Sequence, residues 1–278
     1  MKSKSRSRLA SLTLLDIAAG IAVSAVAIPA LAADMPTKAP APIAAPAYNW
    51  TGFYLGAHAG YRWADADLTA DPYVFTPPSG ALTVPGRAEN YKLNGGIVGI
   101  HGGYNYQFAP QWLLGVEGDW SWGHSSDSLS RTVTGIDSSG SDGFTLNRNS
   151  EVTLNWQATL RGRLGYVSGP WLLYGTGGVA FARVKWSEST ILNTTGPVTV
   201  TTSAWSDSKT LTGWVAGGGV EYMFAPHWIG RVEYLYENFR DFTVPTGLVP
   251  VGSPPRPGTL DLSGVQKVRV GFSYKFGP

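Results

Sequence analysis

The stretch that most constrains the fold is residues 152–166, VTLNWQATLRGRLGY, in which apolar and polar residues alternate. Because successive side chains of a β-strand point to opposite faces, this pattern predicts one strand with an apolar and a polar, cationic face. It is much longer than the roughly five or six residues of an ordinary strand. A soluble sheet would bury the apolar face, whereas a membrane barrel turns it to lipid and keeps the arginines inside. The apolar face contains Val152, Leu154, Trp156, Ala158, Leu160, Gly162, Leu164 and Tyr166.

The same alternation recurs along the chain, which decides between these two folds. Besides the strand at 152–166, it predicts seven strands, at residues 53–63, 98–106, 112–122, 171–185, 214–224, 228–237 and 268–276. The glycine-rich strand 171–185 is ambiguous, and we favour an outward direction for Leu173, Val179 and Phe181. After the N-terminal region, no apolar run approaches the roughly 20 residues that a membrane helix needs. The expected fold is therefore built from strands.

The connections between these strands alternate in length. Three are tight, around Ala109-Pro110, at 167–170 and around Ala225-Pro226, and four are long, at 64–91, 124–150, 187–209 and 240–263. Bacterial outer-membrane barrels combine an even number of strands with short periplasmic turns and longer extracellular loops. The sequence therefore predicts an all-β fold, an eight-stranded antiparallel up-and-down transmembrane β-barrel, with both mature termini in the periplasm.

Aromatic residues gather at both ends of the predicted strands, as in the interfacial belts of membrane proteins. The belt at the short turns would contain Tyr48, Trp50, Phe108, Trp112, Tyr166, Trp171, Phe224, Trp228 and Phe276. The belt near the long connections would contain Trp63, Trp120, Trp122, Trp186, Trp214 and Tyr236.

The N-terminal region divides the chain into three parts. Residues 1–32 combine basic residues, an apolar run and the small-x-small site Ala30-Leu31-Ala32, which predicts a cleavable signal peptide; a retained membrane helix is the alternative. Residues 33–47 form a Pro/Ala-rich periplasmic linker, and 48–278 the barrel domain. The chain has no cysteine, which excludes disulfides, a thiolate metal site and a lipidated N-terminal cysteine. Its net charge of +2 gives no indication of a nucleic-acid partner.

Seven segments spread over the predicted strands carry a resemblance to a known family: YNWTGFYLGAHAGY (48–61), GGIVGIHGGYNYQF (95–108), WLLGVEGDW (112–120), LRGRLGY (160–166), YGTGGVAFARV (174–184), GGGVEYMFAPHW (217–228) and VRVGFSYKF (268–276). Together they resemble the small outer-membrane β-barrel family of alphaproteobacteria, often called outer-membrane immunogenic or porin-family proteins. The resemblance covers nearly all of the mature chain except the long connections. It implies an eight-stranded barrel in the outer membrane of a Gram-negative cell, exposed loops and a role in envelope integrity; a generic pore role is also often assigned. One departure is that Gly277-Pro278 follow Phe276, where such barrels usually end on the aromatic residue.

The inward positions of the predicted barrel contain charges of both signs. Eight strands enclose a lumen only wide enough for side chains to fill, and pairing offsets the cost of burying each charge. We therefore expect a structural ionic plug, with a continuous ion path as the alternative. If the two Ala-Pro turns centre on proline, Glu221 faces Arg231 and His101 faces Asp119. The predicted lumen network is Arg62, Glu117, Asp119, Arg161, Arg163, Glu221, Arg231, Glu233, Lys267 and Arg269, and the barrel-closing C-terminal strand contributes Val268, Val270, Phe272, Tyr274 and Phe276.

Two motifs suggest chemistry, and each has a simpler interpretation. His58 and His101 on adjacent inward faces, with Asp119, offer zinc ligands, but polar lumen packing is the commoner role. His124-Ser125-Ser126-Asp127 contains the residue types of a hydrolase, but consecutive loop residues do not hold a nucleophile and a base together. We therefore expect no catalytic site, metal or cofactor.

The predicted function is a structural role in the envelope with display of the four long connections. The alternatives are a narrow porin-like diffusion channel and recognition of a host or surface ligand by the loops. The expected partners are outer-membrane lipid and lipopolysaccharide, the barrel-insertion machinery and periplasmic chaperones. No nucleic acid is expected, and a ligand of the loops stays open.

Overall fold

The computed structural model describes residues 48–75, 81–136, 140, 143–194, 201–247 and 255–277. The predicted signal peptide and linker lie outside these ranges. Within them the chain forms β-strands and their connections. No helix in the described part of the chain has the length and apolar character that a membrane crossing requires.

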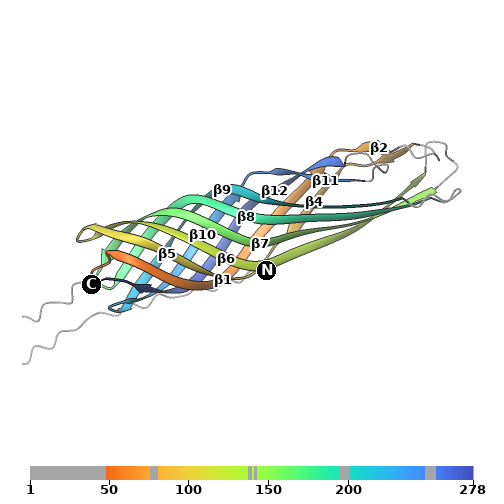
Figure 1. Cartoon of the computed structure of the whole chain (residues 1–278). Coiled ribbons are helices and arrows are strands. Elements are labelled where there is room, and N and C mark those ends of the chain that lie inside the picture. Colours follow the sequence, from red (N-terminus) through yellow and green to blue (C-terminus); the bar gives the residue numbers. More distant parts are fainter. Residues whose placement is uncertain are drawn as a thin grey trace, which may run out of the picture. The chain divides into compact units, whose positions relative to one another are not determined.

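Eight long strands form a closed antiparallel ring, which confirms the predicted barrel (Figure 1). Each strand pairs with the next in the ring, and the last pairs with the first. Four shorter strands, β2 (Tyr73–Phe75), β3 (Leu82–Val84), β4 (Arg87–Lys92) and β11 (Phe242–Thr246), lie outside this ring order. The ring runs in the order β1 (Gly52–Ala70), β5 (Gly95–Ala109), β6 (Trp112–Ile136), β7 (Gly143–Ser168), β8 (Trp171–Thr194), β9 (Thr201–Ala225), β10 (Trp228–Phe239) and β12 (Arg256–Lys275).

The three tight turns are present. Beside two of them, one strand of the hairpin contains an extra residue without a partner on the other strand. At the first Ala-Pro turn the register shifts by one, because Phe108 has no Cα partner on β6. A shift of the same kind at the second places Glu221 opposite Arg231. His101 likewise lies opposite Asp119. The predicted register is therefore confirmed, and in both hairpins a bulge beside the turn produces it.

The described parts of the four long connections, by contrast, are mostly strand, so their prediction as loops was wrong. Most of the described residues in 124–150 and 187–209 continue strands β6 to β9 (Figure 1). On β6, for example, the strand continues past Trp122 of the outer aromatic belt to Ile136. We call the part of the barrel beyond the outer aromatic belt the extension. In it, as far as the described residues show, β4 pairs only with β1 and β11 pairs only with β12. The ring therefore continues as two four-stranded sheets, β4-β1-β12-β11 and β6-β7-β8-β9.

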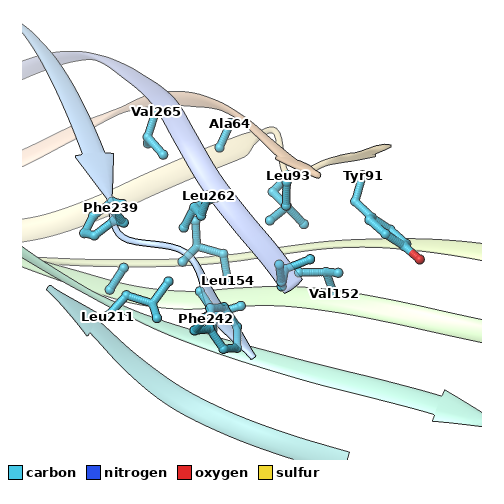
Figure 2. Close-up of a cluster of buried hydrophobic side chains, with 14 of the residues drawn as sticks. Ala64, Tyr91, Leu93, Val152, Leu154, Leu211, Phe239, Phe242, Leu262 and Val265 are labelled. Carbon is cyan, nitrogen blue, oxygen red and sulfur yellow. The ribbon is translucent and has the colours of Figure 1, made fainter. Parts of the chain in front are cut away.

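An apolar core, which we call the upper core, fills the interior between these two sheets. It contains residues of β7 that were predicted to face outward, so that part of the prediction was wrong. Leu160 and Leu164 point outward as predicted, but Val152 and Leu154 are fully buried. A bulge between Leu154 and Gln157 adds one residue, so the side chains before it face the opposite way. A similar shift occurs on β12 at Gly264, whose φ of 67° suits glycine. Figure 2 shows side chains of this cluster projecting from several strands into one interior space.

The outward face carries two aromatic belts, but the predicted belt residues Tyr48, Trp50 and Trp186 do not belong to them. Tyr48 is half-buried and packs against the interior cluster that contains Trp50. Trp50 is fully buried at the short-turn end, where it packs in a cluster with Leu113 and Leu172, among others. Trp186 is fully buried in the upper core, and its Nε1 donates to the Pro245 carbonyl oxygen at 2.9 Å. The inward residues of β8 have even numbers, as Leu172 and Ala182 do, so the number of Trp186 was the sequence signal that it points inward. In the fifth predicted strand, Leu173 and Val179 are exposed as expected, and Phe181 is half-buried on the same face.

Candidate functional site

A layer of buried charges crosses the middle of the barrel. All ten predicted lumen residues lie on inward positions of the ring strands, and each is at most 7% exposed. The residues proposed for the barrel-closing strand instead form the outward face of β12 and its end. They are Val268, Val270, Phe272, Tyr274 and Phe276.

The ion pair that spans the lumen most directly joins β10 to β6. Arg231 donates from Nη1 to Glu117 Oε2 at 2.6 Å and from Nη2 to Glu117 Oε1 at 2.9 Å. Glu221, the Cα partner of Arg231, lies 3.7 Å away and forms its closer ion pair, at 2.9 Å, with Arg163. The register prediction therefore gave the right neighbour but the wrong main partner.

Arg161 and Arg269 link the remaining carboxylates of this layer. Arg161 donates to Glu233 Oε1 at 2.8 Å and to Asp119 Oδ2 at 3.1 Å, and it also contacts Glu117. Arg269 donates to Asp119 Oδ1 at 2.9 Å and from Nε to Glu233 Oε2 at 3.0 Å. Each of these carboxylates is thus shared by more than one guanidinium, which offsets much of their desolvation cost.

Two tyrosines complete the layer on the short-turn side. Tyr54 donates its hydroxyl proton to Glu117 Oε2 at 2.7 Å and accepts from Arg163 Nη1 at 3.0 Å. The Arg163 guanidinium also lies 4.0 Å from the centre of the Tyr174 ring, a cation–π contact. Tyr174 in turn donates to Glu233 Oε1 at 2.9 Å. In the alternating pattern of their strands, both tyrosines occupy positions that face inward. This alternation was the sequence signal that could have placed them in the lumen.

A second chain of contacts crosses the lumen nearer the upper core. Lys267 Nζ donates to Glu237 Oε1 at 2.6 Å, and Gln157 Nε2 donates to the other Glu237 oxygen at 2.8 Å. Gln157 Oε1 accepts from Arg62 Nη1 at 2.9 Å. Arg62 also donates to Ser125 Oγ at 2.7 Å and has no carboxylate within 4 Å among the described residues. Glu237 was absent from the predicted network, although it shares the inward parity of Glu233.

Apolar clusters bound the ionic layer on both sides, which the sequence had not predicted. Along β8 the inward residues run from Leu172 at the short-turn end to Ala182 and Trp186 in the upper core. The residues of β7 between these levels include Arg161 and Arg163. The charged side chains are therefore buried at a level between the two apolar clusters.

His58 and His101 form a buried pair at the edge of this layer. Their Nδ1 atoms are 3.3 Å apart, and their Nε2 atoms contact Ser121 and Ser273. The rings fit because Gly99 and Gly56 face them: a Cβ on Gly99 would come within 2.5 Å of His58 Nε2. No group of three or more His, Cys, Asp or Glu side chains in the described ranges is arranged to hold a metal ion.

The residues at 124–127 do not converge. Ser125 is buried and accepts a hydrogen bond from Arg62, whereas His124 is exposed and lies 3.3 Å from Asn155 Oδ1. Asp127 Oδ2 accepts from the backbone N–H of Lys92. Their side chains serve separate structural contacts.

Comparison with known proteins identifies the family. The family model described as the outer membrane protein beta-barrel domain matches residues 18–276. The chain belongs to this family. A 31 kDa outer-membrane immunogenic protein of Brucella melitensis is 34% identical over 273 residues, which cover 96% of this chain and 99% of that relative. A 22 kDa outer membrane protein of Rhizobium leguminosarum is 30% identical over 73% of this chain and 71% of its own length. The protein is thus an outer-membrane β-barrel.

Solved structures of other members of the barrel class are more distant. OprG of Pseudomonas aeruginosa has a TM-score of 0.42 and 14% identity, and the match covers 82% of this chain and 97% of OprG. The attachment invasion locus protein Ail of Yersinia pestis has a TM-score of 0.31, with 81% of this chain and 99% of Ail covered.

Proposed function

We propose that this outer-membrane β-barrel has a structural role in the cell envelope and that its lumen is closed to ions. The observation that carries the proposal is the cross-lumen contact between Arg231 and Glu117 inside a layer with apolar clusters on both sides. A continuous ion path would require hydrated space between these side chains. Their direct hydrogen bonds instead support a solid interior.

The proposal includes an orientation in the membrane. Short turns face the periplasm in bacterial barrels, so we infer that the short-turn end and both mature termini are periplasmic. The two-sheet extension then projects from the cell surface. Its strands, rather than flexible loops, would display the surface of the protein.

The proposed partners follow from this placement. The exposed apolar side chains between the aromatic belts, such as Leu160 and Val268, suit outer-membrane lipid. Lipopolysaccharide would surround the outer belt, and export would require the signal peptide, periplasmic chaperones and the barrel-insertion machinery. We propose no enzymatic activity, because the residue types that suggested hydrolysis are engaged in separate contacts.

Single-channel recording of the refolded protein tests the closed lumen. A closed barrel should give no steady current steps at the nanosiemens scale in a planar bilayer. Steady steps of that size in the wild type would replace the structural proposal with a narrow diffusion channel. For the envelope role, deletion of the gene should increase sensitivity to detergent, and expression of the full chain should restore resistance.

A further inference from the structure

The extension contains a cavity at the seam between β4 and β6, where the two sheets are not joined by a ladder. The cavity has a volume of about 350 Å³. Three arginines from three strands line it: Arg87 on β4, Arg131 on β6 and Arg148 on β7. Glu89 is the one carboxylate among its described lining residues. We call this cavity the seam pocket.

Two of these arginines are buried without complete hydrogen bonding. The side chains of Arg87 and Arg148 are 8% and 7% exposed. Arg87 Nη2 donates to Glu188 Oε2 at 2.5 Å, but its Nη1 has no hydrogen-bond partner. Arg148 Nε is 3.7 Å from Glu188 Oε1 and also has none. An unpaired buried N–H of a charged group is costly, so an acceptor bound in the seam pocket would stabilise these donors.

The nearby carboxylates already have other donors. Glu188 Oε1 accepts from the backbone N–H of Gly247 at 2.8 Å and lies near Arg148, whereas Glu188 Oε2 accepts from Arg87. Glu89 Oε2 accepts from the Tyr91 hydroxyl at 2.8 Å and lies 3.8 Å from Arg87 Nη1. The three arginines and these two carboxylates therefore carry a net formal charge of +1 at the seam pocket.

We propose that the seam pocket binds a phosphate group carried on a sugar. Guanidinium groups from three directions match the several acceptor oxygens and the double charge of a phosphate monoester better than a planar, singly charged carboxylate. The volume exceeds what phosphate alone would fill, and Pro85 and Val133 supply apolar wall against a sugar ring. This inference concerns the extension alone and is independent of whether the lumen conducts.

Calorimetric titration of the refolded full chain in a zwitterionic detergent tests the pocket. The probes are glucose 6-phosphate, inorganic phosphate and glucose. Glucose 6-phosphate should bind saturably in about the millimolar range or tighter, inorganic phosphate more weakly, and glucose should not bind. Absence of saturable binding by both phosphates would overturn the proposal.

The variants separate the pocket from general attraction to a cationic protein. Arg131 is exposed and has no described ion-pair partner, so Arg131→Gln should leave the fold intact and weaken glucose 6-phosphate binding about tenfold. Arg148→Gln should weaken it at least as much. The matched control is Arg183→Gln on the outer face of β8, where Arg183 donates to Ser208 and Thr210; its affinity should equal the wild type. An equal loss in all three variants would contradict a specific site.

The phosphate has two natural sources, which a second measurement distinguishes. Binding of intact but not of dephosphorylated lipopolysaccharide, lost in Arg131→Gln, would assign the pocket to a phosphate of a membrane glycolipid. Binding of glucose 6-phosphate without any dependence on lipopolysaccharide phosphate would assign it to a soluble phosphorylated sugar. Both outcomes support the seam pocket, whereas lipopolysaccharide binding that is unchanged in Arg131→Gln, together with unchanged glucose 6-phosphate binding, overturns it.

Discussion

Arg231 and Glu117 are joined by two hydrogen bonds across the lumen, although three strands separate them in either direction around the ring. Their strands, β10 and β6, are therefore opposite walls of the barrel. This side-chain contact between opposite walls spans the lumen at that level. It also ties together strands that share no backbone ladder, so it stabilises the ring in a way that pairing of neighbours does not.

Arg231→Ala should lower the free energy of unfolding by about 3–5 kcal/mol, because Glu117 and its neighbours are left as buried charges with fewer partners. Adding Glu117→Ala should recover part of that loss in the double variant. The measurement is urea unfolding in lipid vesicles, together with single-channel current, which should rise above the wild-type level in Arg231→Ala. The exposed Arg240→Ala is the control and should change neither quantity.

The partner of Arg231 illustrates what the sequence can and cannot predict. Alternation and turn length predict which residues are neighbours on adjacent strands, so Glu221 was correctly placed opposite Arg231. A contact across the ring depends on the barrel radius and on how every other lumen side chain packs. The coupling of Arg231→Ala with Glu221→Ala should consequently be smaller than with Glu117→Ala. A larger coupling with Glu221 would contradict the observed geometry.

The bulge in β7 gives a second test, which uses the absence of cysteine from the chain. Leu160 is 61% exposed and Leu154 is fully buried. In the folded barrel, Leu160→Cys should react quickly with a lipid-soluble maleimide, whereas Leu154→Cys should react at least about tenfold more slowly, because local opening must precede reaction. Leu164→Cys, also on the outer face, is the positive control. Equal rates at 154 and 160 would mean that the alternation continues without a bulge.

The sequence did not predict the upper core, because the strands that form it have the composition of loops. The segments beyond the belt are rich in Ser, Thr, Gly and Asp, as expected for strands whose outward faces meet water rather than lipid. That composition is also typical of loops, and sparse inward apolar residues such as Leu129 and Leu192 did not outweigh it. A single unpaired residue at 155–156 then reverses every inward assignment before it, and no local pattern in the sequence marks that residue.

Orientation in the membrane can be tested with inserted epitopes. Gly140 is exposed between β6 and β7, and Gly169 lies in the short turn between β7 and β8. An epitope after Gly140 should be detected by antibody on intact cells and leave barrel yield unchanged. An epitope after Gly169 should be detected only after the outer membrane is permeabilised. Detection of the Gly169 epitope on intact cells would reverse the proposed orientation.

The last prediction concerns a pair of carboxylates in the extension, beyond the outer aromatic belt. Asp261 on β12 lies directly opposite Asp67 on β1. Partial burial, followed by the negative charges of Asp241 and Asp67, raises the pKa of the Asp261 carboxyl above its ordinary value. A carboxyl whose pKa is higher in the folded than in the unfolded state favours folding at low pH, and this contribution is lost as the pH rises through the folded-state pKa.

Asp261→Asn should therefore raise the melting temperature at pH 7 and leave it nearly unchanged at pH 3, where both states are protonated. The rise should be about 1–2 °C, because changes at a largely solvated group stay near 0.5 kcal/mol. High salt should reduce it by screening the neighbouring charges. Asp207→Asn removes the same charge on β9 and keeps an acceptor for the backbone N–H of Ser208, so it is the matched control and should show no such rise. A lower melting temperature for Asp261→Asn at pH 7 would mean that the ionised carboxylate stabilises the pairing of β1 with β12.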